Sequence, residues 1–282
     1  MAIRPLEDQL PLPEDECLHF TEESEVPPEL KKYWHQRYSL FEWYDYRVCL
    51  THDAWFGVTP EAVAHRIAMD MPSHSLSNPP KDTIVDLFAG VGGNTIAFAL
   101  SGKWDRVIGI ERDPATLACA QHNASVYEVP DGVITWVLAD SLDYLARIKQ
   151  LQQQHRGATG RKESHSVDPA LHLDVSRTVL FASPPWGGVN YRDQDVFDLS
   201  TMRPYSLETL HEACRPMEHA LYLPRTSDMR QIAKLAPNDG TKLEVVQYCM
   251  EGASKAMVVY VPAEEEASHR PEGVKKRAQK TP

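Results

Sequence analysis

The sequence lacks several features that would assign it to a common class of protein. No apolar run reaches the roughly 18 residues that a membrane helix needs, and the N-terminus has no apolar stretch suited to a secretory signal. Only five cysteines occur in 282 residues, widely spaced and without a C-x-x-C pair. We therefore expect neither a disulfide framework nor a cysteine zinc site. The same pattern predicts a protein of a reducing compartment. The twelve histidines show no ligand spacing, so no metal is expected.

An excess of positive charge is also lacking. The chain carries 29 lysines and arginines against 40 aspartates and glutamates, for a net charge of -11. Residues 1–30 alone hold nine acidic residues and one basic residue, which leaves the rest of the chain close to neutral. A general basic surface for binding long duplexes is therefore excluded, whereas a local basic pocket for a short anionic substrate is not.

Composition divides the chain into four parts. Residues 1–30 are acidic and rich in proline, which predicts a disordered tail. Residues 31–75 begin with a dense run of aromatic residues and predict a small helical extension that must fold or dock. Residues 76–262 alternate short apolar strands with helices, which predicts a Rossmann-like α/β fold around a mostly parallel seven-stranded sheet, with a polar insertion at 149–176. Residues 263–282 are basic and predict a second disordered tail.

A glycine turn follows the first strand of the α/β region. In the segment DLFAGVGGNT, Gly90, Gly92 and Gly93 stand between a strand and a helix, where glycine lets the backbone turn tightly and approach a ligand. Glu111 ends the next strand about 20 residues later, where an acid can accept hydrogen bonds from ribose hydroxyls. Asp140 ends the third strand and suits an adenine amino group. Polar groups at three successive strand ends predict a nucleoside pocket.

The details of this turn distinguish between nucleoside ligands. No P-loop lysine follows it, which disfavours ATP hydrolysis, and Thr95 stands where a dinucleotide fingerprint has its third glycine. S-adenosylmethionine needs only a short glycine turn beside its methionine part, an acid for the ribose and a contact for adenine. We therefore expect S-adenosylmethionine to be the cofactor.

The motif SPPWGG follows the fourth strand, at the carboxyl end where open α/β sheets bind ligands. Two consecutive prolines fix the backbone and remove two N–H donors. The acceptors that remain are the Ser183 hydroxyl and the carbonyls of Ser183 and Pro184. They suit a planar exocyclic amine, whose lone pair they can orient toward a methyl donor. Trp186 offers a face on which a base can stack. We therefore predict that Ser183, Pro184 and Trp186 form the catalytic group.

The motifs together resemble one family. The segments KYWHQRYSLFEWYD, WFGVTPE, DLFAGVGGNTIAFAL, HNASVYEV, SPPWGG and LPR, within residues 31–262, are similar to the trimethylguanosine synthases. The resemblance implies a class I S-adenosylmethionine-dependent methyltransferase. It would methylate guanine N2 twice on the 7-methylguanosine cap of small nuclear and nucleolar RNAs, giving 2,2,7-trimethylguanosine.

The resemblance also implies partners and a location. The partners would be the capped small nuclear and nucleolar RNAs and the proteins of their snRNP and snoRNP particles, with no membrane. The location would be the nucleus, including the nucleolus, with some protein in the cytoplasm. A KKR cluster near the C-terminus is a candidate nuclear address, although such clusters are usually solvated charge.

Roles carry over residue by residue from the resemblance. The cofactor-binding set is Asp86, Gly90, Gly92, Gly93, Glu111 and Asp140. Asp86 and the glycines would hold the methionine part, Glu111 the ribose and Asp140 the adenine. Trp186 would stack on 7-methylguanine, and Ser183 with Pro184 would receive the N2 amine.

A wider cap-binding set follows in the same way. Its members are Trp186, Asn123, Tyr191, Arg225, Lys255, Arg47, Trp55 and Phe56. Asn123 would line the base pocket. Tyr191, Arg225 and Lys255 would contact the cap phosphates, with Arg47 as a fourth contact. Trp55 and Phe56 belong to the N-terminal segment that would fold over the site.

Two positions depart from the family pattern, and two other functions stay open. Many relatives carry aspartate where this chain has Glu111, and cysteine where it has Ala89; glutamate can still reach a ribose, and Ala89 would only pack.

One alternative is a guanine-N2 or adenine-N6 methyltransferase on other RNA, which would need a route for a flipped internal base. The other is a catalytically silent scaffold that binds caps.

Overall fold

The structure is a computed structural model. It describes residues 3–6, 8–72, 80–157, 171, 173–187, 194–237, 241–250 and 252–263. The basic tail from residue 264 on, with its KKR cluster, lies outside the described residues. So do Tyr191 and residues 158–170 of the predicted insertion. No helix in the described part of the chain combines the length and the apolar character that crossing a membrane requires.

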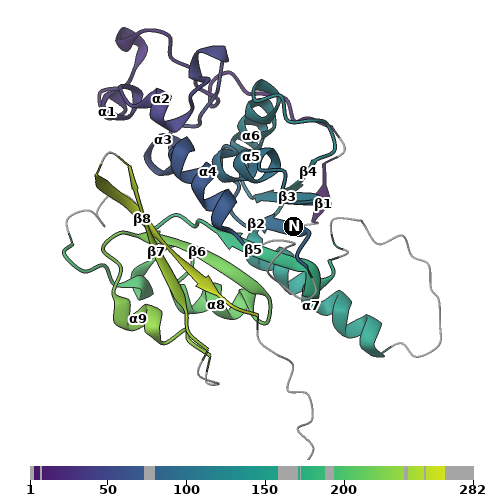
Figure 1. Ribbon diagram of the computed structural model, residues 1–282. Helices are drawn as coiled ribbons and strands as arrows, with labels where there is room; N and C mark the ends of the chain where they lie inside the picture. The colour runs from purple at the N-terminus through teal and green to yellow at the C-terminus, as the bar shows by residue number, and fades with distance from the viewer. Residues whose placement is uncertain are drawn as a thin grey trace, which may run out of the picture.

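An eight-stranded sheet forms the centre of the molecule (Figure 1). Its strands are β1 Arg4–Pro5, β2 Thr83–Asp86, β3 Arg106–Glu111, β4 Ile134–Leu138, β5 Thr178–Ala182, β6 Glu218–Pro224, β7 Glu244–Met250 and β8 Ala253–Val261. They lie in the order β1-β4-β3-β2-β5-β6-β8-β7. Strands β2 to β6 pair in parallel, whereas β1, β7 and β8 are antiparallel to their neighbours. The predicted Rossmann-like fold is confirmed, and β1 adds a short edge strand to the seven strands expected.

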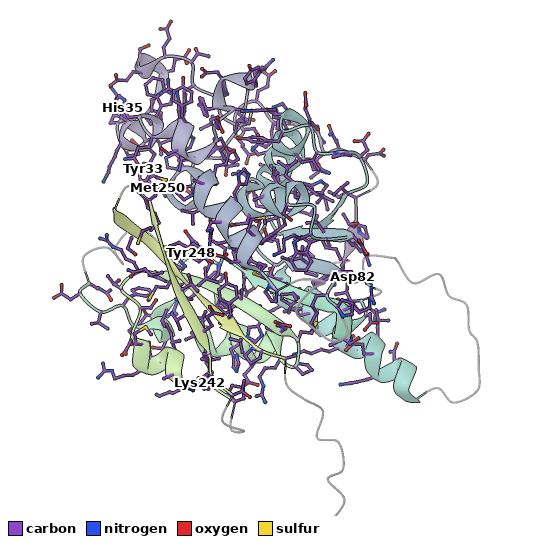
Figure 2. The ribbon with its side chains drawn as sticks, viewed as in Figure 1. Tyr33, His35, Asp82, Lys242, Tyr248 and Met250 are labelled. Carbon is purple, nitrogen blue, oxygen red and sulfur yellow. The ribbon has the colours of Figure 1, made fainter. Side chains whose placement is uncertain are left out.

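Helices cover both faces of the sheet, which explains why the parallel strands are continuous apolar runs. One face carries α4 Glu61–Asp70, α5 Gly93–Leu100 and α6 Pro114–Val126, and the other carries α7 Ser141–Gly157, α8 Leu207–Cys214 and α9 Met229–Ala233 (Figure 1). At the β7 edge, Tyr248 (labelled in Figure 2) reaches α4, where its hydroxyl donates a hydrogen bond to Asp70 at 3.0 Å.

Local chemistry sets where several of these helices begin. Asp113 caps α6 by accepting a hydrogen bond from the Thr116 N–H at 2.8 Å, and Pro114 takes the first helical position, where its missing N–H costs nothing. Ser206 caps α8 in the same manner. Thr59, just before α4, does not cap that helix, although threonine is a common capping residue. It is buried and its hydroxyl accepts a hydrogen bond from the Asn94 side chain at 2.9 Å.

The order of the strands reverses between β2 and β5. Asp86, at the end of β2, lies opposite Phe181 of β5, and the Leu87 N–H donates to the Phe181 carbonyl at 2.8 Å. The loops that follow these two strands therefore start from adjacent points and diverge. Such a switch point is where open α/β sheets bind their ligands.

Residues 8–30, here called the N-terminal strap, are packed rather than disordered as we predicted. The Leu10 N–H donates to the Gln121 side chain on α6 at 2.8 Å. Leu18 and Leu50 exchange two backbone hydrogen bonds, each 2.9 Å long. The strap side chains buried in the core are Cys17, Val26 and Leu30. Average composition hid these apolar residues because they are spaced out among the acidic ones.

Residues 31–58 continue from the strap and share its core. They form the short helices α1 Lys31–Trp34, α2 Arg37–Leu40 and α3 Ala54–Gly57. Trp34, Tyr44 and Trp55 are buried in the same hydrophobic cluster as the residues of α4, α5 and α6. The N-terminal segment therefore packs on the same side of the sheet as α4, α5 and α6 and shares one hydrophobic core with them (Figure 1).

Candidate active site

The glycine loop, residues 87–92, joins β2 to α5 at the switch point. Gly90 and Gly92 have backbone φ angles of +55° and +97°, which side chains rarely tolerate. A Cβ atom at Gly92 would lie 2.9 Å from Ile96 Cδ1, so this glycine is needed to pack the turn onto α5. A Cβ atom at Gly90 would meet nothing within 4 Å. Gly90 is therefore the point at which a ligand can approach the loop.

Gly93 has a different use from the one predicted. A Cβ atom on Gly93 would lie 3.1 Å from Val58 Cγ2 and 3.6 Å from the Thr59 carbonyl oxygen. The space that the glycine leaves is filled by the end of the N-terminal segment. Gly93 thus lets residues 58–59 approach the end of the glycine loop closely.

Asp86 lies behind the glycine loop with no exposed surface. One carboxylate oxygen accepts a hydrogen bond from the Phe88 N–H at 3.2 Å, and the other accepts from the Thr95 hydroxyl at 2.7 Å. Burial raises the pKa of Asp86 to about 7, against the effect of these two hydrogen bonds, and nearby Glu111 raises it further. Asp86 therefore ties the start of the loop to α5, the helix that follows it.

Glu111 connects the end of β3 to the same loop. Its Oε2 accepts a hydrogen bond from the Gly90 N–H at 3.1 Å, and its Oε1 accepts from the N–H groups of Arg112 and Asp113 at 2.8 and 3.0 Å. Burial raises the pKa of Glu111, and these three donors oppose the rise. The carboxylate is partly exposed beside the open point at Gly90.

Asp140 follows β4, beyond Glu111 in the row of strand ends. Its Oδ1 caps α7 by accepting hydrogen bonds from the N–H groups of Leu142 and Asp143, at 2.9 and 3.3 Å. Its Oδ2 accepts a hydrogen bond from the Tyr205 hydroxyl. The register places β4 next to β3, with Glu111 opposite Leu138. The two acidic side chains therefore follow neighbouring strands, as the sequence predicted.

The acceptor loop, residues 183–187, follows β5 on the other side of the switch point. Ser183 is partly exposed and Pro184 is buried. The indole of Trp186 stacks on Tyr222 of β6, with ring centroids 5.7 Å apart and planes 19° from parallel, and its N–H donates to the Tyr222 carbonyl at 3.3 Å. Strand β6 therefore fixes the orientation of the indole beside the acceptor carbonyls.

Two of the predicted basic residues are brought together next to this loop. Pro224, the last residue of β6, lies opposite Ala256 of β8. Because the two strands are antiparallel, Arg225 and Lys255 are neighbours at the same end of the sheet. Arg225 is exposed and Lys255 is partly exposed, so both can meet an anion. The structure therefore places two basic side chains at one end of the sheet, in agreement with the local cluster of positive charge that the net charge did not exclude.

Comparison with known proteins identifies the family. The RNA cap guanine-N2 methyltransferase family matches residues 81–264. The trimethylguanosine synthase of Schizosaccharomyces pombe is 35% identical over 237 residues, which cover 83% of this chain and 87% of the relative. The chain belongs to the RNA cap guanine-N2 methyltransferase family. The trimethylguanosine synthase of Saccharomyces cerevisiae is 28% identical over 258 residues, covering 86% of this chain and 72% of the relative.

A solved structure agrees with the fold. A methyltransferase from Porphyromonas gingivalis W83 superposes with a TM-score of 0.55 at 16% sequence identity. The match covers 86% of this chain, which spans about half of that protein (52%). At this level of identity the likeness concerns the fold alone.

The cofactor of this RNA cap methyltransferase is S-adenosylmethionine, and the residues present fit it. The open point at Gly90 lies beside the Glu111 carboxylate, which suits donors such as the ribose hydroxyls. Asp140 follows the adjacent strand as an acceptor for an amino group. Asp86 supports the loop from behind and is too deeply buried to touch the cofactor itself.

Asn123 does not line the base pocket, in contrast to our prediction. It is fully buried on α6, and its side-chain carbonyl accepts a hydrogen bond from the Cys49 N–H at 2.9 Å. Its amide group donates to the Cys49 and Val91 carbonyls, both at 2.9 Å. Asn123 therefore joins the N-terminal segment, α6 and the glycine loop of the methyltransferase.

Three other predicted cap residues lie in the N-terminal segment. Trp55 is 1% exposed and packs near Tyr44, with ring centroids 5.7 Å apart, so it belongs to the core rather than to the cap pocket. Phe56 is partly buried against the edge of Tyr33, at 5.1 Å.

Arg47 also lies apart from the predicted phosphate site. Its carbonyl accepts a hydrogen bond from His122 at 2.8 Å. His122 lies about 12 Å along α6 from its first residue, at a rise of 1.5 Å per residue. Because α6 packs on β3 and β4, this position is across the switch point from Arg225 and Lys255. The structure does not bring Arg47 to them.

Sequence reasoning missed three aromatic residues of the site. Tyr222 supports Trp186, Tyr205 reaches Asp140, and Phe88 of the glycine loop lies beside Tyr205 with ring centroids 6.4 Å apart. No local signal could have found Tyr205, because 65 residues separate it from its partner. Phe88 and Tyr222 could have been suspected, because they lie in or next to strands that end at the site.

We expect Glu111→Ala to weaken binding of S-adenosylhomocysteine by about 1.5–3 kcal/mol, the loss of one hydrogen bond to a charged group, because three backbone N–H groups already use the other acceptor positions of the carboxylate. Glu111→Gln keeps the shape of the side chain and one acceptor, so its loss should be smaller. Calorimetric titration of the three proteins measures the affinities. An alanine variant that binds as tightly as the wild type would remove Glu111 from the cofactor site.

We also expect Asp86 to make stability depend on pH. A free aspartate loses its proton near pH 3.9, whereas the pKa of Asp86 is raised to about 7. Between these values the folded protein holds a proton that the unfolded chain has lost, so the free energy of unfolding falls as pH rises. Asp86→Asn should remove up to about 1.4 kcal/mol of this fall per pH unit. Denaturant unfolding at several pH values tests this; equal slopes for both proteins would contradict it.

Proposed function

We propose that this enzyme methylates the guanine N2 of a 7-methylguanosine cap twice, giving 2,2,7-trimethylguanosine. One observation carries the proposal: the glycine loop and the acceptor loop start from adjacent, hydrogen-bonded points of β2 and β5. A methyl donor held by the first loop and an amine held by the second would therefore meet at the switch point. The names of the two curated relatives support the trimethylated product.

The residues of the acceptor loop suit an exocyclic amine. The acceptors available to the amine are the Ser183 hydroxyl and the carbonyls of Ser183 and Pro184. Because two prolines follow each other, the loop has few N–H donors that would compete with the amine. When bound, the cofactor supplies an electrophilic methyl group on a sulfonium. The acceptors hold the amine protons, which turns the nitrogen lone pair toward that methyl group without covalent or metal chemistry.

The remaining contacts select a cap. Trp186, held against Tyr222, presents an indole to the base, and a cationic 7-methylguanine stacks on an indole more strongly than neutral guanine does. Arg225 and Lys255 lie together where the cap phosphates would leave the pocket. A pair of basic side chains on a nearly neutral body favours the end of an RNA over the middle of a duplex.

A single assay tests the proposed reaction. The protein is incubated with S-adenosylmethionine and 7-methylguanosine triphosphate, and the products are separated by mass. We expect products with one and with two added methyl groups. Binding of the cap without turnover would instead identify a silent scaffold. The absence of both would favour a methyltransferase that acts on other RNA.

We also propose that the natural substrates are small nuclear and small nucleolar RNAs, delivered with the proteins of their particles in the nucleus. The family of RNA cap methyltransferases supports capped RNA as the substrate. Recovery of RNA with an antibody against trimethylguanosine, from cells with and without the protein, tests the substrates. Imaging of the tagged full chain tests the location. Unchanged recovery of these RNAs, or exclusion from the nucleus, would contradict this part of the proposal.

A further inference from the structure

Residues 194–206 run from a contact with the loop after β6 to Asp140, the residue expected to contact adenine. We call residues 194–206 the crossing segment. Near its end, the hydroxyl of Tyr205 donates a hydrogen bond to Asp140 Oδ2, and its ring lies beside Phe88 of the glycine loop. The same segment packs beside Gly187 of the acceptor loop. A Cβ atom on Gly187 would lie 3.8 Å from the backbone nitrogen of Arg203. One segment thus touches both halves of the site.

The hydrogen bonds of Asp140 leave room for one more donor. A carboxylate offers about four acceptor positions, two on each oxygen. The N–H groups of Leu142 and Asp143 use two positions on Oδ1, and Tyr205 uses one on Oδ2. Among the described residues, these bonds leave the second position of Oδ2. Its direction is set by Tyr205, because Tyr205 holds the same oxygen.

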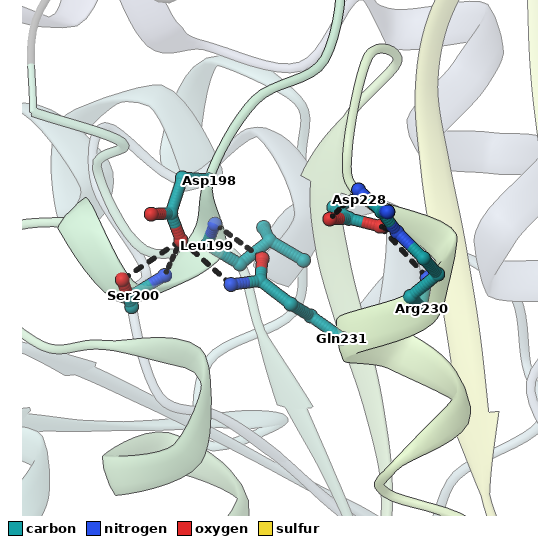
Figure 3. A network of polar contacts seen from close by, with 6 residues as sticks. All are labelled: Asp198, Leu199, Ser200, Asp228, Arg230 and Gln231. Carbon is teal, nitrogen blue, oxygen red and sulfur yellow. Dashed lines mark hydrogen bonds and ion pairs between the residues drawn. The ribbon is translucent and has the colours of Figure 1, made fainter.

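The other end of the crossing segment is anchored independently. The Gln231 side chain of α9 accepts a hydrogen bond from the Leu199 N–H at 2.7 Å and donates to Asp198 at 2.6 Å (Figure 3). The Phe197 N–H also donates to the Thr226 carbonyl at 2.7 Å. These contacts hold the start of the segment on α9 and the loop after β6. The other end of the segment is bonded to Asp140 through Tyr205. The position of Tyr205 relative to Asp140 is therefore fixed by contacts at both ends of the segment.

We propose that Tyr205 is a positioning residue for the cofactor, whose hydroxyl orients Asp140 so that its remaining acceptor position receives the adenine amino group. The proposal rests on the use of S-adenosylmethionine by the proposed function, and not on which nucleoside accepts the methyl group. It differs from a purely structural role. A tie that only stabilised the crossing segment would change the stability of the protein and leave its preference for adenine as it was.

The test removes one oxygen atom. Tyr205→Phe keeps the ring beside Phe88 and deletes the hydroxyl. We expect S-adenosylhomocysteine to bind about tenfold more weakly, as for the loss of a hydrogen bond to a charged group. The KM for S-adenosylmethionine should rise by the same factor, while the KM for the cap analogue stays unchanged.

A matched control is available on the far edge of the sheet. Tyr248→Phe deletes another tyrosine hydroxyl bonded to an aspartate, Asp70, but between β7 and α4 (Figure 2). The same hydroxyl also bonds that of Tyr260, so this variant loses at least as much polar contact as Tyr205→Phe. It should change the melting temperature and leave the affinity for S-adenosylhomocysteine unchanged. The comparison separates a lost tyrosine–aspartate bond in general from the loss of this one in the site.

Two further measurements show whether Tyr205 acts through Asp140. In an Asp140→Asn background, Tyr205→Phe should weaken binding by less than about twofold further, because its target is already changed. The wild type should also prefer S-adenosylhomocysteine over its inosine analogue, which lacks the amino group, and Tyr205→Phe should reduce that preference. Wild-type affinity in Tyr205→Phe, full additivity with Asp140→Asn, or an unchanged preference would overturn the proposal. Titration without a cap keeps this outcome separate from failure of the proposed methylation.

Discussion

Trp186→Ala is expected to lower kcat/KM for 7-methylguanosine triphosphate by about two to three orders of magnitude. Stacking of a base on an aromatic ring contributes about 1–3 kcal/mol, and the positive charge of 7-methylguanine adds about 0.5–2 kcal/mol on an indole face. Both contributions are lost together. The phosphate contacts proposed for Arg225 and Lys255 would not restore the discrimination, because they would be the same for methylated and unmethylated caps.

The position of the indole explains why so much of the effect should fall on one residue. Tyr222 stacks on Trp186 at 5.7 Å and its carbonyl accepts the indole N–H at 3.3 Å, so the ring is already oriented before a base arrives. Trp186→Phe keeps an aromatic face but loses this hydrogen bond. It should bind the cap more weakly than the wild type and discriminate less between methylated and unmethylated guanine.

The decisive measurement is kcat/KM for 7-methylguanosine triphosphate and for GTP in the wild type and both variants. Trp104→Phe is a suitable control, since Trp104 is a buried tryptophan that lies before β3, at the end of the sheet away from the site. It should alter stability alone. The role of Trp186 is wrong if the wild type methylates GTP equally well, or if Trp186→Ala leaves the ratio of the two values unchanged.

A chain that begins at Thr59 is expected to lose both its activity and its solubility. Removing residues 1–58 takes away Trp34, Tyr44 and Trp55, which are buried in the same cluster as α4, α5 and α6. The apolar surface of these helices would then face water, and exposed patches of that kind cause association. The start of α5 would also lose its close neighbour Val58, which fills the space that a Cβ atom on Gly93 would need.

Asn123→Ala tests the same coupling without removing any chain. The substitution leaves the Cys49 N–H and the carbonyls of Cys49 and Val91 without their buried partner. An unsatisfied buried group costs about 1–3 kcal/mol, so the melting temperature should fall markedly. A shortened chain that remained soluble and fully active, or an Asn123→Ala protein with unchanged stability, would show that the N-terminal segment is a separable domain.

The sequence by itself determined the α/β region and which polar residues stand at its strand ends. The seven main strands, the glycine turn, Glu111 and Asp140 at successive strand ends, and the acceptor motif were all predicted from residues within one element or one turn. This worked because strand formation, the glycine backbone and the loss of donors at consecutive prolines are local properties. Parallel strands also bring their carboxyl ends to one edge, whichever residues they carry.

Only the tertiary structure decided what the long-range partners are. Asn123 finds Cys49 across 74 residues, and Tyr205 finds Asp140 across 65. The acidic strap is packed because its few apolar residues meet the N-terminal segment and α6, a gain that average composition cannot register. The sequence names the side chains that can donate, accept or pack. Which of them meet depends on how helices, sheet and strap are brought together, because burial and hydrogen bonds form between residues that the chain alone leaves far apart.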